Sequence, residues 1–335
     1  IMAMTDLDLP PARPSRVAQR PGALQRLMSD YGQEIVVLLA IVALFVVVTA
    51  INPRFVSPNN LTSIFAGNAY IAVAAIGMSM VIITGNIDVS VGALIGVLAT
   101  ISGTLAVAGY PVWVAWFAPV LVGMAINGLI GVLVAYARIP SIVVTLGALS
   151  ILRGGLISAT GGTWISDLPP AFMIAQMKLF GLPVPIVAML VLTLLAAAWM
   201  RYSAFGRSLY ALGGNPEAAV ATGIPAERRI VAVFVIHGMF AGLATILFAT
   251  QLQVIQSTVP PNLELTIITA AVIGGVSILG GSGTVIGSTL AAILFATIGS
   301  ALIFTNVSAY WLRAVIGLLI LATVLADMYR RSRRV

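Results

Sequence analysis

The sequence predicts an all-α integral membrane protein. Hydrophobic residues fill 60% of its 335 positions, the mean hydropathy is +1.09, and only 8% of the residues are charged. Soluble domains carry about 25% charged residues, so this chain is too apolar for an ordinary water-soluble core. Apolar runs of about 20 residues recur along it, and a run of that length crosses a bilayer as a helix. The fold class is therefore a bundle of membrane-spanning helices.

About ten such runs divide the chain into one transmembrane domain with two polar tails. We expect spans near residues 33–52, 65–85, 89–109, 112–136, 140–159, 182–200, 230–254, 264–279, 284–304 and 308–327. Residues 1–30 are arginine-rich and polar and form an amino-terminal tail, residues 31–328 form the transmembrane domain, and residues 329–335 form a basic carboxyl-terminal tail.

The basic residues predict the orientation of this domain. Cytoplasmic loops of membrane proteins carry an excess of Lys and Arg. With an even number of spans, most of the 17 Lys and Arg residues fall on one side, in the two tails and in the loop 201–229, whereas Arg54 and Lys178 fall on the other. An odd number would separate the tail arginines from the loop arginines. Both termini are therefore expected in the cytoplasm.

The loop 201–229 is the longest polar interruption after the first span. A glycine pair ends one helix, and Asn215 is then a good N-cap for the next. Pro216 fits the first helical position, and Glu217 lies where the helix dipole favours an anion. Gly223 ends this short helix. Such a helix on a basic loop is either an interfacial helix on lipid headgroups or a contact for a soluble partner.

Several stretches, including this loop, carry a family resemblance. They are Ala204-Phe205-Gly206-Arg207, Ala211-Leu212-Gly213-Gly214-Asn215, Ala218-Ala219 with Gly223-Ile224, Asn86-Ile87-Asp88-Val89-Ser90-Val91-Gly92, Thr145-Leu146-Gly147 with Arg153-Gly154, and Leu279-Gly280-Gly281-Ser282-Gly283. Together they resemble the ribose-type sugar permeases, which are the membrane subunits of ATP-binding-cassette (ABC) importers. The resemblance extends over residues 59 to 327.

The resemblance implies partners and a site for one of them. In that family the short helix of the cytoplasmic loop is the coupling helix, which sits in a cleft of the ATPase subunit. The ATPase-coupling residues it implies are Asn215, Pro216, Glu217, Ala218, Ala219, Gly223 and Ile224. It further implies a second permease subunit, identical or homologous, a periplasmic sugar-binding protein, and a multi-pass location in the bacterial inner membrane. ATP and Mg would be bound by the ATPase subunit.

The chain itself offers little for catalysis. It has no cysteine, its single histidine is His237, and no group of residues has metal-ligand spacing. It also lacks the G-x-x-x-x-G-K-[ST] motif that cradles phosphates. The net charge of +7 reflects loops and tails of a membrane protein rather than a nucleic-acid surface. We therefore expect a transport subunit that is not an enzyme, with no metal, cofactor or nucleic acid of its own.

Polar residues in or near the spans are candidates for the substrate pathway. They are Asn86, Asp88, Asn127, Arg153, His237 and Gln251. Hydroxyl-rich sugars are held by such donors and acceptors. A polar residue in a span is also often only a helix–helix contact, worth ~0.6 kcal/mol on average. Asp88 in particular is either the N-cap of the third span or a gate residue.

Arg153 lies inside the fifth span, ~20 Å along it from Pro140. A charge at such depth costs roughly 2.5–3.5 kcal/mol, so its side chain should face protein or water. The alternative is an arginine that snorkels to the outer headgroups. Gly154 beside it allows a local break that would let water or substrate approach.

The outer face carries further candidates for contact with a binding protein. In the long outer loop, Trp164 and Phe180 are expected as interface anchors, and residues 173–180 as a short helix in the headgroup plane. Glu264 is expected as a first-turn acid at the outer end of the eighth span.

The expected function is that of a permease subunit in an ABC importer for a monosaccharide or related small sugar-like ligand. Within the family, the variants Asn86-Ile87-Asp88-Val89 and Gly161-Gly162-Thr163-Trp164-Ile165 look more like the autoinducer-2 and rhamnose permeases. A branched-chain amino-acid permease is one alternative, with the same fold and partners. An ion-coupled secondary transporter is another, but it needs carboxylates at the membrane midplane, and the acidic residues here fall at span ends, in loops or in the tail.

Overall fold

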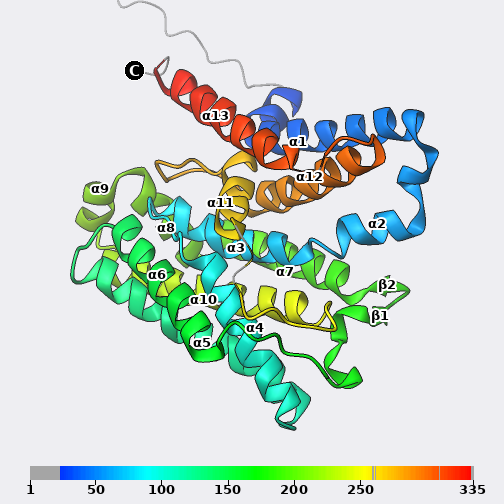
Figure 1. The fold of residues 1–335 in the computed structure, drawn as a ribbon. Coiled ribbons are helices and arrows are strands. Elements are labelled where there is room, and N and C mark those ends of the chain that lie inside the picture. Colours follow the sequence, from blue (N-terminus) through cyan, green and yellow to red (C-terminus); the bar gives the residue numbers. More distant parts are fainter. Residues whose placement is uncertain (1–22, 259, 261, 309, 333–335) are drawn as a thin grey trace, which may run out of the picture. The chain divides into compact units, whose positions relative to one another are not determined.

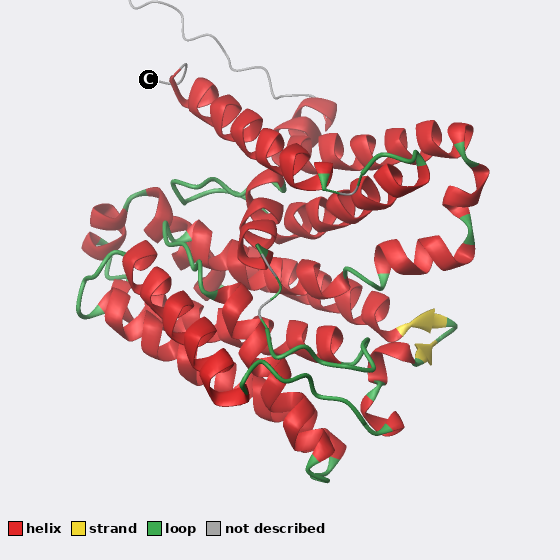
Figure 2. Cartoon of the chain, in the orientation of Figure 1, coloured by secondary structure: helices red, strands yellow, loops and turns green. Residues whose placement is uncertain are grey.

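The computed structural model describes residues 23–258, 260, 262–308 and 310–332 (Figure 1). Its α-helices are Ala23–Ile51 (α1), Pro58–Phe65 (α2), Ala69–Ile83 (α3), Val91–Val107 (α4), Val112–Ala135 (α5), Ser141–Thr160 (α6), Val184–Tyr202 (α7), Ala204–Gly214 (α8), Pro216–Ala221 (α9), Ala226–Ala249 (α10), Leu263–Ile273 (α11), Val285–Phe304 (α12) and Trp311–Ser332 (α13). Helix dominates the described chain, with one small hairpin as its strand content (Figure 2). The all-α prediction is confirmed.

The predicted amino-terminal tail falls largely outside the described residues, and the carboxyl-terminal tail does so in part. Residues 1–32 form a unit of their own, of which the first part of α1 is described. Tyr31 has non-helical dihedrals (φ −130°, ψ 21°), which interrupt α1. At the other end, residues 333–335 of the predicted basic tail are not described, and α13 contains the rest.

Seven described helices are long and apolar enough to cross a membrane. They are Tyr31–Ile51, Pro58–Ile83, Val112–Ala135, Ser141–Thr160, Val184–Tyr202, Ala226–Ala249 and Val285–Phe304. Three apolar helices are shorter, namely Val91–Val107, Leu263–Ile273 and Trp311–Thr323. The chain is a multi-pass membrane protein. The count of ten spans and the cytoplasmic termini stay predictions.

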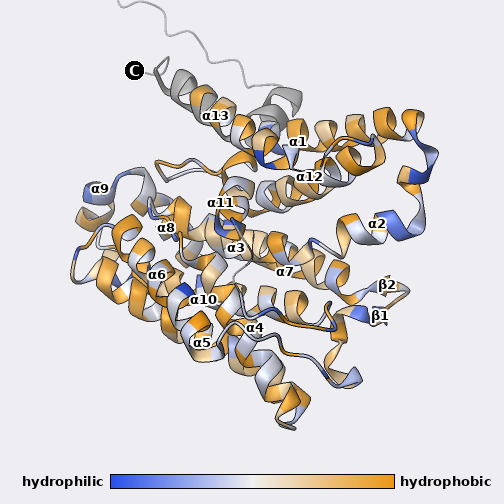
Figure 3. Cartoon of the chain, viewed as in Figure 1, coloured by the Kyte–Doolittle hydropathy of each residue, from blue (hydrophilic) through white to orange (hydrophobic). Residues whose placement is uncertain are grey.

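Helix α3 lies in the core of the bundle. All of its residues except Tyr70 are buried, and α7, α10, α11 and α12 pack around it. It is hydrophobic on every side, as expected for a helix that protein surrounds completely. Helix α6 is the opposite case, because only Ser141, Thr145 and Leu156 are buried along it. Figure 3 shows hydrophobic residues along the length of both α5 and α6.

Helices α5 and α10 approach each other closely through glycine. A Cβ added at Gly123 would lie 2.6 Å from the carbonyl oxygen of Gly238, and one at Gly131 would lie 2.9 Å from the Phe234 side chain. Small residues let helix backbones come together in membranes, where van der Waals packing drives association. This pair supplies a rigid wall beside α3.

Two irregular segments separate core helices. Residues 84–90, the first break, join α3 to α4, and residues 274–284, the second break, join α11 to α12. Both use left-handed glycines, for example Gly85 at φ 79° and Gly280 at φ 84°. Non-helical backbone at membrane depth is tolerated where protein surrounds it or where it lines a polar cavity.

The loop 160–182, which is predicted to lie outside and is called the outer loop below, does not form the helix expected over residues 173–180. It contains two short 3-10 turns, Pro170–Phe172 and Ile174–Gln176, and then a hairpin of Lys178–Leu179 (β1) with Leu182–Pro183 (β2). The hairpin forms because Phe180 (φ 54°) and Gly181 (φ 81°) both adopt positive φ, as a tight two-residue turn requires. Phe180 at its tip is 92% exposed and Trp164 is 62% exposed, as membrane-interface anchors would be.

Candidate functional site

Helix α9 has the capped geometry predicted for the loop 201–229. Asn215 is its N-cap, and its Oδ1 accepts a hydrogen bond from the Ala218 N–H at 3.0 Å. Pro216 opens the helix and Glu217 lies exposed in its first turn. Gly223 follows at φ 88°. An anion in the first turn and a left-handed glycine after the last are favourable at these two ends.

The other predicted coupling residues divide between the surface and the support of α9. Ala218 is exposed, whereas Ala219 is only 4% exposed. The Ile224 N–H donates to the Ala219 carbonyl at 3.1 Å, which ties the following segment to the helix. The exposed side of α9 therefore carries Glu217 and Ala218, together with Val220, which is 54% exposed.

Helix α8 connects α9 to the core through what we call the coupling junction, made of Tyr210 and Gly213 with Ile83, Gly281 and Gly283. The Tyr210 hydroxyl donates to the Gly283 carbonyl at 2.9 Å. Burial, and secondarily the charge of Glu34, raise the pKa of Tyr210, so its hydroxyl stays protonated as a donor. A Cβ on Gly213 would lie 2.5 Å from Gly281 N and closer still to the Ile83 oxygen.

The coupling junction reaches both breaks. Ile83 is the last residue of α3 and precedes the first break, while Gly281 and Gly283 belong to the second. The Gly281 N–H also donates to the Ile83 carbonyl at 2.9 Å. The backbone of α8 at Gly213 therefore packs against this hydrogen bond, which joins the end of α3 to the second break. A displacement of α8 would act on the second break and, through the end of α3, on the first.

Three of the six predicted pathway residues lie together as a buried group, the Asp88 cluster of Asp88, Asn127 and His237. All three are fully buried. His237 Nε2 lies 3.3 Å from Asp88 Oδ2. With its amide oriented so that donors meet acceptors, Asn127 donates to Asp88 Oδ2 and accepts from the Gly238 N–H, both at 3.3 Å. The cluster joins the first break to α5 and α10.

Asp88 also fixes the start of α4, although not as the N-cap of its first-turn amides. Its Oδ1 accepts from the Ser90 N–H at 2.7 Å and from the Ser90 hydroxyl. Ser90 is the N-cap residue. The other ring nitrogen of His237, Nδ1, lies against Gly77 and has no hydrogen-bond partner among the described residues. Because these groups are buried, a role in the pathway would require the cluster to open.

The remaining pathway candidates lie apart from this cluster. Asn86 is half-buried and donates to Thr84 Oγ1 at 3.0 Å. Gln251 donates to the Ala66 carbonyl at 3.0 Å, at the end of α10. The first bond stays within the first break, and the second joins the end of α10 to the residue that follows α2.

Arg153 has a partner that the sequence did not reveal. Its Nη2 lies 3.5 Å from Glu264 Oε1. Glu264, expected at the outer end of a span, is only 6% exposed and lies against Gly92 in the first turn of α4. Glu264 does lie in the first turn of α11, as expected, but this helix has only 11 residues and its first turn is buried, with Leu263 4% exposed. The polar residues before α11, such as Gln253 and Gln256, are the sequence feature that could have indicated this interior position.

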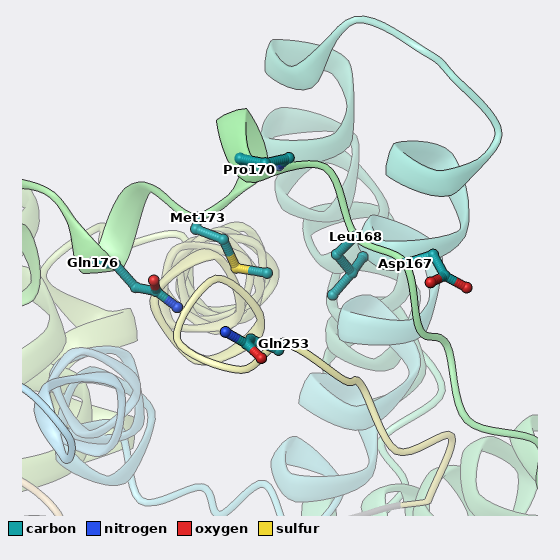
Figure 4. Close-up of a pocket in the computed structure, with 6 residues that line it drawn as sticks. All are labelled: Asp167, Leu168, Pro170, Met173, Gln176 and Gln253. Atoms are coloured by element: carbon teal, nitrogen blue, oxygen red, sulfur yellow. The ribbon is translucent and has the colours of Figure 1, made fainter.

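An outer pocket of about 380 Å³ lies between the long outer loop and the segment after α10. Its lining residues are Asp167, Leu168, Pro170, Met173, Gln176 and Gln253. In Figure 4 the amides of Gln176 and Gln253 point toward one another, beside the Met173 side chain, and the Asp167 carboxylate points away from them. A bridge between Ile165 and Ile255 ties the two segments together. The pocket is therefore a small, mixed polar and apolar surface.

A family model matches residues 60–324, which is most of the chain. Its description is branched-chain amino acid transport system / permease component. The chain belongs to this family of permease components.

Named relatives of this permease agree with that assignment. It is 39% identical over 296 residues to the autoinducer 2 import system permease protein LsrC of Salmonella typhi, covering 88% of this chain and 85% of the relative. It is 38% identical over 301 residues to LsrC of Escherichia coli (strain K12 / DH10B), covering 88% and 86%. No solved structure matches the chain.

The described features of the permease thus fall into an exposed part and an interior part. Helix α9 is exposed, and α8 connects it to the breaks. The Asp88 cluster joins the first break to α5 and α10, and the Arg153–Glu264 pair joins α6 to α11.

Proposed function

We propose that the chain is the membrane-spanning permease subunit of an ABC importer for a small sugar-like ligand. A separate ATPase subunit would bind α9 and hydrolyse ATP with Mg, a second permease subunit would complete the pathway, and a periplasmic binding protein would deliver the ligand. The observation that carries this proposal is the capped, exposed α9 on a helix that contacts both breaks of the core.

The geometry supports a mechanical role for α9. Its exposed residues are free for a partner, while Ala219 and the backbone bond from Ile224 attach it to the chain behind it. Movement of α9 would move α8, and α8 packs at Gly213 against the hydrogen bond between Gly281 and Ile83. ATP-driven closure of the partner would in this way change the arrangement of α3, α4, α11 and α12. This chain supplies the pathway and its lever, and the ATPase supplies the free energy.

The proposed ligand class rests on the relatives. Those reported above are named for autoinducer 2 import, and the motif variants around Asp88 and Trp164 resemble the autoinducer-2 and rhamnose permeases. We propose autoinducer 2 or rhamnose as the first ligands to test. The six pathway candidates, Asn86, Asp88, Asn127, Arg153, His237 and Gln251, stay part of this proposal. The family description makes a branched-chain amino acid the alternative ligand.

The test is a charge reversal on α9. Glu217→Arg places a cation at a helix amino terminus and changes the exposed surface without touching the core. The tagged variant and wild type are purified from their own membranes, the accompanying proteins are identified by mass spectrometry, and uptake of autoinducer 2, rhamnose and leucine is measured in vesicles. We expect the variant to insert normally and to lose both the ATPase subunit and uptake.

Asp167→Arg is the matched control, because it reverses an exposed acidic residue on the outer loop. It should retain the ATPase subunit. Normal uptake by Glu217→Arg would remove the coupling role of α9. Uptake of leucine alone by wild type would replace the sugar-like ligand with an amino acid, and uptake without ATP would contradict the ABC mechanism.

A further inference from the structure

Arg153 is a half-exposed charge on a membrane-length helix. It lies about 18 Å from the start of α6, well inside the apolar span. Its side chain is 44% exposed, and its one ion pair among the described residues is the 3.5 Å contact with Glu264. A guanidinium carries five N–H donors, so a single long contact leaves most of them available. Such a group is costly in hydrocarbon and needs a polar neighbour.

Glu264 holds this guanidinium at a defined place. Its side chain is 8% exposed, it lies in the first turn of α11, and its Oε2 is buried against Gly92 without a hydrogen-bond partner among the described residues. Only Oε1 faces Arg153. The carboxylate is therefore fixed between α4 and α11 and is itself inaccessible. It positions the arginine rather than offering a surface of its own.

The surface of α6 next to Arg153 is open. Ser150, one turn earlier, is exposed, and its hydroxyl donates to the Leu146 carbonyl at 3.1 Å. Side chains added at Gly147 or Gly154 would meet nothing within 4 Å. These residues lie beside Ser150 on the helix, because positions three and four apart share a face. A small molecule could reach the guanidinium from this side.

The segment that leads to Glu264 is polar and irregular. The described residues between the end of α10 and the start of α11 form no helix, and the exposed ones include Gln253, Gln256 and Thr258. Irregular backbone beside a short half-helix is typical of ligand pathways in transporters, since lipid does not satisfy its polar groups. The segment also contributes Gln253 to the outer pocket. Along the chain, this segment therefore connects a residue of that pocket to Glu264.

We propose that Arg153 is a ligand-contacting residue of the pathway, held in place by Glu264, and that it takes a small, neutral, hydroxyl-bearing molecule. The guanidinium donates hydrogen bonds to ligand hydroxyl or carbonyl oxygens on the open face of α6. This inference rests on the proposed import function and adds to it a contact residue and a positioning residue. A neutral ligand fits because the neighbouring carboxylate already balances the charge of Arg153.

The absence of native cysteine makes a direct test simple. Ser150→Cys places one thiol a turn from Arg153 with almost no change in shape, and Ile151→Cys places one on another face, roughly 200° around the helix from Arg153. Ile151 is 74% exposed, so both thiols are sterically accessible. The whole importer in membrane vesicles is treated with a charged methanethiosulfonate or with a lipid-soluble maleimide, with and without autoinducer 2 or rhamnose.

We expect the charged reagent to modify S150C at least tenfold faster than I151C, and either autoinducer 2 or rhamnose to slow that modification. Adding Arg153→Lys to S150C should raise the ligand concentration for half-protection about tenfold, because the planar, forked donor set is lost. Adding Glu264→Gln should raise it less, since the arginine remains but is held less firmly. Arg54→Gln, which removes a charge far along the sequence from α6, serves as the control and should leave protection unchanged.

Three results would overturn the inference. Modification of S150C by the lipid-soluble reagent alone would show a lipid-facing surface. Oxidative cross-linking of S150C between two copies, without ligand protection, would show a subunit contact. Reaction with the charged reagent that neither ligand slows, or that Arg153→Lys leaves equally protected, would remove the ligand contact. Uptake by wild type, measured in the same vesicles, reports separately on the import function.

Discussion

The two breaks in the core helices are held by different kinds of contact. The first break is held by side chains, because Asp88 meets Ser90, His237 and Asn127 inside the protein. The second break is held mainly by backbone, because Gly281 pairs with Ile83 and packs against α8 at Gly213, and the Tyr210 hydroxyl adds one side-chain bond to the Gly283 carbonyl. The first contact depends on chemical identity, and the second depends on the absence of a side chain.

This difference predicts how each break responds to change. A polar cluster tolerates small shifts but not the loss of an acceptor, since a buried donor left unpaired costs about 1–3 kcal/mol. A glycine contact tolerates loss of polarity but not added volume, and overpacking costs about 1–3 kcal/mol. The first break should therefore be sensitive to the loss of a polar group, and the second to added volume. Substitutions can test this contrast directly.

The largest effect is expected for Asp88→Ala. It removes the acceptor of the Ser90 N–H and the partner of His237 and Asn127 in a fully buried place. With more than one buried group left unpaired, the free energy of unfolding should fall by about 3 kcal/mol. Unfolding of the purified protein in mixed micelles measures it. Asn86→Ala, which removes a half-buried amide two residues earlier, is the control, and an equal loss in both would show that the Asp88 cluster is not what holds this break.

Gly213→Ala should have an intermediate effect. The new methyl group would lie within 3 Å of the Ile83 oxygen and of Gly281 N, so α8 must move away from both breaks. We expect a loss of about 1–3 kcal/mol in the free energy of unfolding, and reduced uptake per ATPase turnover. Gly214→Ala is the matched control, because a Cβ there meets nothing within 4 Å. If the two variants behave alike, the coupling junction does not depend on close backbone contact.

The smallest effect is expected for Ser288→Ala. The hydroxyls of Ser79 and Ser288 lie 2.6 Å apart and connect α3, before the first break, to α12, after the second. Hydrogen bonds between membrane helices contribute ~0.6 kcal/mol on average. A double-mutant cycle with Ser79→Ala should return a coupling energy of that size. A value near zero would mean that this hydroxyl pair adds nothing to the packing of α3 against α12.

Much of the fold could be predicted from the sequence, because its signals are local. The capped α9 follows from Asn215, Pro216 and Gly223, which act on their own neighbours. The positions of the long apolar helices follow from hydropathy. The number of membrane crossings did not follow with the same certainty, because α4 and α11 end or begin at irregular segments inside the bundle, which hydropathy does not register.

The partners inside the bundle could not be predicted. Asp88, Asn127 and His237 lie on three different elements, and only the packing of the first break, α5 and α10 against one another brings them together. Asn127 and His237 alone are typical of helix–helix contacts, and Asp88 alone is typical of an N-cap. The residue types therefore could not show whether these residues form a buried structural cluster or line the substrate pathway. Arg153 was recognised by its depth, but its partner Glu264 had the sequence context of an ordinary first-turn acid.

The shortness of α11 has a consequence for how the protein responds to bilayer thickness. With 11 residues it is about 16 Å long, roughly half of a ~30 Å hydrocarbon core. Helices α5 and α10 have 24 residues each, about 36 Å, and cover the full thickness. Hydrophobic mismatch therefore acts on α5 and α10, which can tilt to meet it, whereas α11, most of whose residues are buried, is shielded by protein. Lipids of shorter or longer chain should change the tilt of the wall while leaving the Arg153–Glu264 pair in place.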